Sequence, residues 1–422
     1  MQNPSPNVLA QEARKAFRVL ALASSKSRET ALLAIAVEIE KNTDNILAAN
    51  QKDVDNGVKA GLTNAFIDRL MLNNERLGWI TTDLRRVASL PDPVGKVFEN
   101  QTMPNGLKVR KQRVPLGVLA VIYEARPNVT VDAAGLALKS GNVVILRGSS
   151  ETLNSNRALI ACIHSGLTIA GLPTGAVQFV DSPSRELVLD LLKLHDFIDM
   201  VIPRGGSALH TFCRENSLIP VITGGIGICH LFVDESADLV RSLPVIRNAK
   251  IQRPSVCNAL DTLLVHSSVA RTFIPQVVDT LGRDGVIFHV DEKAAHYLPA
   301  PFSNSVQIAG VSDFDTEWLS LVLGIKVVEN LEEAIDHISL HSTSHSDGIL
   351  TENEQNAQIF IAQVDSAAVY VNASTRFTDG SQLGLGAEVA ISTQRLHARG
   401  PMALRELTTY KWVIEGEYHA RQ

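Results

Sequence analysis

A chain of 422 residues is longer than one hydrophobic core usually extends, so two or three structural units are expected. Its content of 45% hydrophobic and 20% charged residues is that of an ordinary globular protein. The formal net charge of −6 argues against a general role in nucleic-acid binding, because phosphate groups attract basic surfaces.

The cysteine content and the N-terminal residues indicate the cellular compartment in which the protein is expected. The 4 cysteines form no CxxC pair, which argues against a disulfide framework or a structural zinc site and fits a reducing environment. The histidines show no metal-ligand spacing, and we predict no metal. The first residues lack the apolar core of a secretory signal, and no apolar run is long enough to span a membrane. We therefore expect a soluble, cytoplasmic protein.

The N-terminal part of the chain has helical character. Residues 8–52 and 65–88 repeat apolar residues at helical spacing, which predicts a layer of helices over a sheet. Residues 92–114 differ, because two alternating segments flank Asn105-Gly106, a strong hairpin signal. Both faces of this hairpin are polar, so we expect an arm that lies on a partner subunit, where residues 408–414 could pair with a neighbour's arm.

From residue 115 onwards, apolar strands alternate with helices, which predicts a parallel sheet covered on both faces. Ligands bind beyond the carboxyl ends of such strands. Three loops at those ends, 124–128, 147–151 and 203–207, combine arginine with small or polar residues and indicate a site for the phosphates and ribose of a dinucleotide. Because there is no GxGxxG fingerprint, ordinary turns remain the alternative.

A second α/β unit contains Cys257, in a polar segment just ahead of the apolar strand 259–265. A thiol at such a position can face a cleft while backbone N–H groups nearby bind an oxyanion. Cys162, Cys213 and Cys229 lie in helical or strand patterns and are expected to be core residues. The pattern alone leaves a packing role and a nucleophilic role open for Cys257.

Further along the second unit, polar and cationic residues follow the strand 367–371. They are Asn372, Ser374, Thr375 and Arg376. Such a cluster at the end of a strand is typical of a pocket for a small anionic substrate.

Several strings resemble one superfamily. They are VPLGVLAVIYEARPNVTVDAAGLALKSGNVVILRGSSE, VIPRGG, IQRPSVCNALDTLLVH, VNASTRFTDG and LHARGPMALRELTTYKW. Their order resembles the aldehyde dehydrogenase superfamily, and the strings are closest to its branch that reduces γ-glutamyl phosphate. The resemblance runs from about residue 10 to residue 415.

This resemblance implies an α/β fold with two Rossmann-like parallel-sheet domains and a β-hairpin oligomerisation arm. Residues 1–91 and 115–245 would form the NADP(H)-binding domain and residues 246–385 the catalytic domain. Residues 92–114 and 402–422 would form the arm, which makes a homo-oligomer the expected assembly.

The resemblance also implies a reaction. Cys257 would attack the acyl phosphate, release phosphate and form a thioester that NADPH reduces to glutamate 5-semialdehyde, a step of proline biosynthesis. The backbone N–H of Cys257 and the side chain of Asn258 are the expected oxyanion donors. A CoA-acylating dehydrogenase is the alternative enzyme, and a non-catalytic scaffold would tolerate loss of the thiol. A glutamate 5-kinase would be a sensible partner, since the acyl phosphate is labile.

Two positions depart from the general pattern of the superfamily. Hydrolytic members carry a glutamate base two residues before the Gly-Gly turn, where this chain has Ile222. Loss of that base suits a thioester that must avoid water. The usual oxyanion-hole asparagine is replaced by Ala125, which leaves the oxyanion donor open.

Cofactor residues follow from the same resemblance. Arg147 stands where the superfamily has its ribose-binding lysine, and Ser150, with Ser149 beside it, stands where NAD-preferring relatives often have a carboxylate. A guanidinium without that carboxylate favours NADP(H), although Glu151 weakens the argument. Glu317 matches the glutamate that holds the nicotinamide ribose. The remaining expected cofactor contacts are Pro203, Arg204, Gly205 and Gly206.

Charge and position suggest how the substrate is held. Asn372, Ser374, Thr375 and Arg376 are candidates for binding its α-carboxylate. The candidates for its phosphate are Arg126, Arg204, Arg253 and Arg399.

Overall fold

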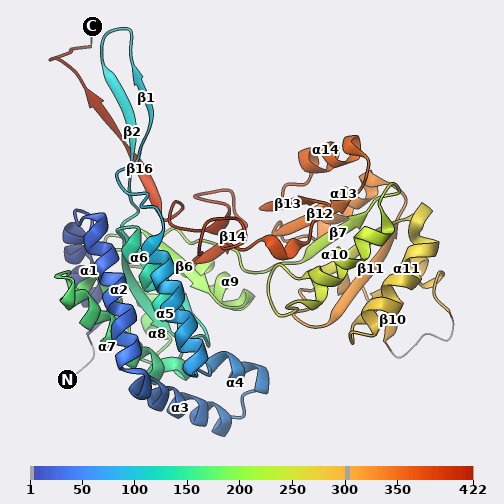
Figure 1. The fold of residues 1–422 in the computed structure, drawn as a ribbon, viewed down its shortest axis with the longest axis horizontal. Coiled ribbons are helices and arrows are strands. Elements are labelled where there is room, and N and C mark those ends of the chain that lie inside the picture. The colour runs from blue at the N-terminus through green and yellow to red at the C-terminus, as the bar shows by residue number, and fades with distance from the viewer. Residues whose placement is uncertain (1–3, 300–304, 422) are drawn as a thin grey trace. The chain divides into compact units, whose positions relative to one another are not determined.

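The computed structural model describes residues 4–299 and 305–421, and the chain divides into two compact units (Figure 1). Unit 1 comprises Met1–Thr223, Gly384–Ala390 and Met402–Gln422, and unit 2 comprises Gly224–Leu383 and Ile391–Pro401. Within the described ranges, no helix combines the length and the hydropathy needed to cross a bilayer.

Unit 1 is built on a four-stranded parallel sheet in the order β5-β4-β3-β6. Every residue of the two central strands is buried, as expected for a sheet covered on both faces. The strands are β3 (Val118–Tyr123), β4 (Val143–Gly148), β5 (Val177–Phe179) and β6 (Met200–Arg204). Helices α6 (Asn128–Lys139), α7 (Leu153–Ile169), α8 (Glu186–Leu192) and α9 (Ser207–Asn216) follow them in turn.

The predicted helical layer is present at the N-terminus of unit 1. Its helices are α1 (Pro6–Leu20), α2 (Ser25–Lys41), α3 (Thr43–Lys59), α4 (Asn64–Leu70) and α5 (Asn74–Ser89). Helix α2 packs closely on α7 at Gly166, where a Cβ would lie 2.6 Å from the backbone nitrogen of Ile35. A glycine is therefore required at that helix contact.

The arm of unit 1 is a three-stranded antiparallel sheet in the order β1-β2-β16, which extends away from the helices of that unit (Figure 1). The strands are β1 (Val97–Thr102), β2 (Lys108–Pro115) and β16 (Thr408–Glu415). The expected turn is present, with Gly106 at a φ of +89°. Strand β16 pairs with β2 of its own chain and is the last strand in the order, so the expected pairing of residues 408–414 with a neighbour's arm stays a prediction. The continuous register with β2 satisfies the backbone groups on one edge of β16, and the other edge is the one that a neighbouring strand could extend.

Unit 2 contains a seven-stranded parallel sheet in the order β10-β9-β11-β8-β7-β12-β13. The strands are β7 (Cys229–Val233), β8 (Leu260–His266), β9 (Ile287–Val290), β10 (Val306–Ile308), β11 (Val322–Val328), β12 (Ser346–Leu350) and β13 (Ala368–Val371). The helices are α10 (Leu239–Ile251), α11 (Ser267–Gly282), α12 (Glu292–Ala295), α13 (Leu331–His341) and α14 (Glu354–Gln363). A separate two-stranded sheet joins β14 (Ala390–Ser392) and β15 (Gly400–Met402).

Alternating side chains of the second sheet fill two cores. Leu263 of β8 belongs to the cluster that includes Phe273 of α11, whereas its neighbour Leu264 belongs to the cluster that includes Phe360 of α14. The division between the units falls after Thr223, whereas the sequence placed it after residue 245. The reason is β7, which pairs with β8 and β12 inside the second sheet.

Candidate active site

Cys257 lies in the loop between α10 and β8 and is half-buried, whereas the other three cysteines are buried. Burial raises the pKa of Cys162 to about 11 and that of Cys213 to about 12, and it raises the pKa of Cys229 well above its ordinary value. A thiol must ionise to act as a nucleophile. Exposure therefore favours Cys257 among the four thiols.

The carbonyl oxygen of Cys257 is contacted by the first residue of β7 and by the segment just before that strand. The thiol of Cys229 donates to this oxygen across 3.2 Å. Gly227 packs against the same group so closely that a Cβ on it would lie 1.5 Å from the oxygen. The hydrogen bond from Cys229 and the close packing of Gly227 thus fix the position of the Cys257 peptide.

Asn258 connects the Cys257 loop to a second loop of unit 2. Its Nδ2 donates to the carbonyl oxygens of Thr378 at 2.9 Å and Arg376 at 3.4 Å. Its own carbonyl accepts from Thr375 Oγ1 at 2.7 Å. Because its amide hydrogens face these carbonyls, the side chain braces the two loops, which differs from the expected donation to an oxyanion. The backbone N–H of Cys257 stays the predicted donor.

Arg376 belongs to the loop that Asn258 holds, and its charge interacts with Cys257. Its Nε donates to Gln252 Oε1 at 3.2 Å. Burial lowers the pKa of Arg376 and nearby Arg253 lowers it further, while the negative charge of an ionised Cys257 acts in the opposite direction. The Arg376 guanidinium therefore contributes to the electrostatic field around this thiol, and Arg253 is a second cation close to Arg376. Such a field stabilises a thiolate and attracts an anionic substrate.

The other residues predicted at this strand end shape the loop. Ser374 Oγ accepts from the backbone of Arg376, and the hydroxyl of buried Thr375 is engaged with Asn258. Asn372 has a φ of +54°, and both ends of its amide bond the backbone of Thr351 at 2.8 Å. These three side chains support the loop, and Arg376 is left as the member of the cluster whose charge interacts with Cys257.

Among the other predicted phosphate ligands, Arg399 belongs to unit 2 and Arg126 to unit 1. Arg399 of unit 2 pairs with Asp365 at 2.6 Å, which neutralises its charge locally. Arg126 of unit 1 is exposed at the turn before α6. The structure therefore does not group Arg399 with Arg376, because a carboxylate already holds it.

Glu317 is linked to Cys257 through Gly227. Its Oε1 accepts from the Gly227 backbone N–H at 2.9 Å. Burial raises the pKa of Glu317 to about 7, the hydrogen bond from Gly227 opposes that rise, and the negative charge of Asp261 adds to it. Asp261 is itself buried beside Lys250, at 3.4 Å from its Nζ, and burial raises the pKa of Asp261 to about 6. The carboxyl group of Glu317 thus has a pKa near neutral pH, and it bonds Gly227, which packs against the Cys257 carbonyl.

Two histidines anchor the loop that carries Glu317. His289 Nδ1 bonds Asp313 Oδ2 at 2.5 Å, and its ring centroid lies 4.5 Å from that of Trp318. His341 Nδ1 bonds Asp315 Oδ1 at 2.7 Å. Sequence reasoning tested these histidines for metal spacing alone and missed this role. The sequence signal that could have indicated this role was the pair Asp313 and Asp315, four and two residues before Glu317.

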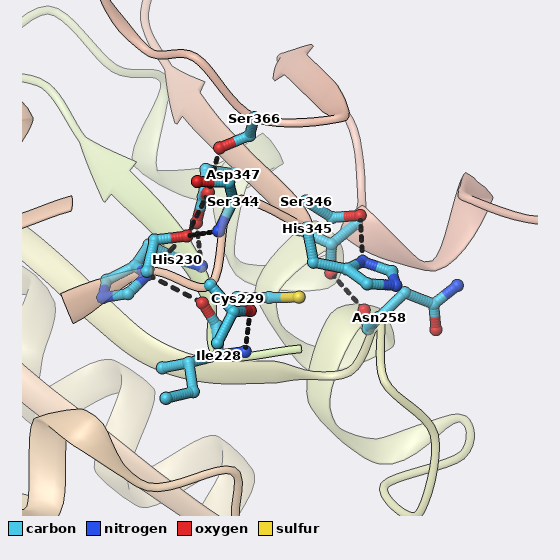
Figure 2. A network of polar contacts seen from close by, with 12 residues as sticks. Ile228, Cys229, His230, Asn258, Ser344, His345, Ser346, Asp347 and Ser366 are labelled. Carbon is cyan, nitrogen blue, oxygen red and sulfur yellow. Dashed lines mark hydrogen bonds and ion pairs between the residues drawn. The ribbon is translucent and has the colours of Figure 1, made fainter. Parts of the chain in front are cut away.

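A buried polar layer flanks Cys229 on both sides (Figure 2). On one side, Asp347 accepts from the His230 backbone at 2.8 Å and from the hydroxyls of Ser342 and Ser366. On the other side lie Asn258 and His345, whose Nδ1 is 2.9 Å from Ser346 Oγ. This layer was not predicted, because its members come from strands that are distant in sequence.

In unit 1, the predicted cofactor loops follow three adjacent strands, with β3 between β4 and β6. Ser149 Oγ accepts from the Ala125 N–H at 3.2 Å, which joins two of the loops. Glu124 Oε2 accepts from the Gly206 N–H at 3.0 Å, which joins the third. A Cβ on Gly205 would lie 2.4 Å from this carboxylate, so the Glu124 side chain would have to shift to admit a larger residue there. Pro203 and Arg204 end β6 at the same edge.

Arg147, at the end of β4, has the properties expected of an anion ligand. It is 8% exposed, and its Nη2 lies 3.4 Å from the carbonyl oxygens of both Pro183 and Ser184. Its Nε is buried without a hydrogen-bond partner, and burial lowers the pKa of the guanidinium. A buried donor without an acceptor fits a site for a phosphate group. Nearby Ser150 is exposed and donates to Glu151 Oε1 at 3.0 Å.

Ile222 is 2% exposed and its N–H donates to the Val201 carbonyl. Its side chain offers no base. Within the described residues, no group of three or more His, Cys, Asp or Glu side chains could hold a metal ion.

Comparison with known proteins identifies the family. Residues 7–291 match the model of the "Aldehyde dehydrogenase family". The chain belongs to this family. Over 413 residues it is 56% identical to a γ-glutamyl phosphate reductase of Vibrio vulnificus (strain YJ016), an alignment that covers 98% of this chain and 99% of that protein. A γ-glutamyl phosphate reductase of Tolumonas auensis is 52% identical, with the same coverage. The family resemblance read from the sequence is confirmed.

Solved structures agree with this membership. The crystal structure of γ-glutamyl phosphate reductase from Thermotoga maritima matches with a TM-score of 0.97 and 46% identity, covering 99% of this chain and 100% of that chain. An acetylating aldehyde dehydrogenase from Geobacillus thermoglucosidasius matches with a TM-score of 0.70 at 17% identity, covering 99% and 97%, and shares the fold alone. The expected aldehyde dehydrogenase-like α/β fold is thus confirmed.

Proposed function

We propose that this chain reduces L-glutamyl 5-phosphate to L-glutamate 5-semialdehyde with NADPH and releases phosphate, as a step of proline biosynthesis. The observation that carries the proposal is the setting of Cys257, a half-buried thiol in the field of Arg376, in a chain 56% identical to a γ-glutamyl phosphate reductase. The fold it shares with an acetylating dehydrogenase does not by itself favour CoA as the acyl carrier.

The first half of the reaction, the formation of the thioester, uses only groups of the protein. The thiolate of Cys257 attacks the acyl carbon, the carbon–oxygen bond to phosphate breaks, and phosphate leaves with the electron pair, which gives a thioester. The Cys257 backbone N–H donates to the oxygen that becomes negative at this carbon. Arg376 and Arg253 stabilise the thiolate and attract the dianionic leaving group.

The second half needs a nicotinamide cofactor, which supplies the hydride that reduces the acyl group. Residues that would hold it are Arg147, Ser149, Ser150, Pro203, Arg204, Gly205 and Gly206 in unit 1 and Glu317 in unit 2. The unpartnered Nε of Arg147 supports the choice of NADP(H), because a 2′-phosphate would supply the missing acceptor. Cys257 holds the acyl group until reduction and is then released as thiolate. Ile222 places an apolar side chain where hydrolytic relatives carry a base, which protects the thioester from water.

The α-carboxylate and the assembly complete the proposal. Arg376 would bind the α-carboxylate or phosphate, with Asn372, Ser374 and Thr375 holding its loop in place. The arm would join subunits of a cytoplasmic homo-oligomer, since Tyr410, Trp412 and Ile414 of β16 are 46%, 53% and 61% exposed. A glutamate 5-kinase is the proposed partner.

The experiment runs the reaction in reverse, because the acyl phosphate is unstable. Glutamate 5-semialdehyde, phosphate and NADP⁺ are supplied, and NADPH absorbance is followed with the wild type and with Cys257→Ser. We expect phosphate-dependent reduction that the variant abolishes. Reduction that requires CoA in place of phosphate would identify an acylating dehydrogenase, and reduction with water alone would contradict the argument from Ile222. No reduction by folded protein would remove the proposed function.

A further inference from the structure

The buried guanidinium of Arg147 faces a turn that the sequence analysis did not assign to any ligand. This turn follows β5, the strand beside β4, and its carbonyls at Pro183 and Ser184 each lie 3.4 Å from Arg147 Nη2. These bonds are long, and the Nε of the same group has no partner. The Arg147 side chain is therefore held at the turn, but the turn does not satisfy all of its hydrogen-bond donors.

The residue that follows this turn is a second arginine. Arg185 is exposed, and its charge lowers the pKa of Arg147, after burial as the larger cause and against the opposing charge of Glu151. No ion pair involves Arg185 in the part of the chain that the structure describes. Arg147 Nη2 lies 3.4 Å from the carbonyl of Ser184, the residue just before Arg185, so two positive groups lie close together and a bound anion would relieve their repulsion.

Three carboxylates of this part of unit 1, those of Glu151, Asp181 and Glu124, are engaged with other groups. Glu151 accepts from Ser150 Oγ at 3.0 Å, and Asp181 pairs with Arg157 Nε at 2.6 Å. Glu124 accepts from the Gly206 N–H, as described above. None of these carboxylates is within ion-pair distance of Arg147 or Arg185 among the described residues. The pair is therefore left available to an external anion.

We propose that Arg147 and Arg185 together bind a phosphate monoester dianion, the 2′-phosphate of NADP(H), and that Arg185 sets the preference for the phosphorylated cofactor. This inference rests on the proposed function. A dianion matches two guanidinium charges, and guanidinium groups arriving from two loops can each donate to different phosphate oxygens. The parallel pairing of β4 with β5 brings Arg185 to Arg147, which sequence position alone does not reveal.

Binding of cofactor fragments tests the inference without catalysis. Isothermal titration compares 2′,5′-ADP with 5′-AMP, which differ by the 2′-phosphate, for the wild type, Arg185→Ala and Arg185→Glu. A matched control is Arg214→Ala, which removes an exposed arginine from α9. We expect the wild type to prefer 2′,5′-ADP, and Arg185→Ala to reduce that preference by about tenfold with affinity for 5′-AMP unchanged, as for the loss of a charge-assisted hydrogen bond. Arg185→Glu should reduce the preference for 2′,5′-ADP further, and Arg214→Ala should leave this preference unchanged.

Steady-state kinetics provides a second readout. Arg185→Ala should raise the KM for NADPH and leave that for NADH unchanged. If the wild type discriminates between the two fragments and Arg185→Ala discriminates equally well, the inference is overturned while the proposed NADP(H) specificity stands. If the wild type binds both fragments equally, both the specificity and the inference fail. A variant that loses affinity for 5′-AMP as well would show general damage to the site and would also count against the inference.

Discussion

The thiol of Cys229 donates a hydrogen bond to the backbone carbonyl of Cys257 across 3.2 Å, so one buried cysteine supports the peptide of another. Cys229→Ala should remove this donor and lower kcat by about twofold to tenfold, the cost of a typical hydrogen bond, while Cys229→Ser should retain most of the activity. The rate at which iodoacetamide alkylates Cys257 reports the same positioning without substrate. Equal rates for the alanine variant, the serine variant and the wild type would show that Cys229 is a packing residue only.

Gly227 provides a steric test of the same peptide. A Cβ at this position would lie 1.5 Å from the Cys257 oxygen, so Gly227→Ala must displace the loop. We expect a loss of about 1–3 kcal/mol of unfolding free energy, typical of overpacking, together with a large fall in kcat. Gly78→Ala is the matched control, since no atom lies within 4 Å of its added Cβ and alanine favours the α5 helix. Denaturant unfolding measures both variants, and an unchanged Gly227→Ala protein would refute the close contact.

Glu317 should make stability depend on pH. Its pKa in the folded protein is raised from 4.5 to about 7, chiefly by burial, so the folded state retains a proton that the unfolded state has lost. Stability contributed by the neutral carboxyl is therefore lost as pH rises from about 4.5 to 7. Glu317→Gln keeps an acceptor for the Gly227 N–H and cannot ionise. The difference in Tm between this variant and the wild type should therefore increase in favour of the variant from pH 4.5 to about pH 7 and stay constant at higher pH. Parallel Tm curves for the two proteins would contradict the raised pKa.

The histidine anchors should affect cofactor affinity. His289→Phe keeps a ring beside Trp318 and loses the bond to Asp313, which frees the loop that carries Glu317. We expect the KM for NADPH to rise by about threefold to tenfold, with a smaller change in kcat. His195→Phe, at an exposed position of unit 1, is the control. A changed kcat with constant KM would assign His289 a different role.

Local patterns predicted most of the fold and part of the site. Continuous apolar strands such as β3 and β8 and the Asn105-Gly106 turn are encoded by adjacent residues, so their prediction succeeded. Cys257 could be singled out because its polar segment contrasts with the strand that follows. The role of Cys229 could not, since it depends on the pairing of β7 with β8. Side-chain partners of Asn258 and Arg399 likewise depend on loops distant in sequence.

Arg376 and Arg399 offer the clearest contrast between the sequence prediction and the structure. Both were candidates for binding the substrate, but the charge of Arg376 interacts with Cys257, whereas Arg399 is paired with Asp365 at 2.6 Å. In the reverse assay, Arg376→Ala should raise the KM for phosphate or for the semialdehyde by about tenfold or more, the loss expected for a charge-assisted contact to an anion. Arg399→Ala should change either KM by less than about threefold, because an exposed ion pair contributes little. The KM that rises identifies which anionic group Arg376 binds. Equal effects of the two substitutions would mean that Arg399 leaves Asp365 to reach the substrate.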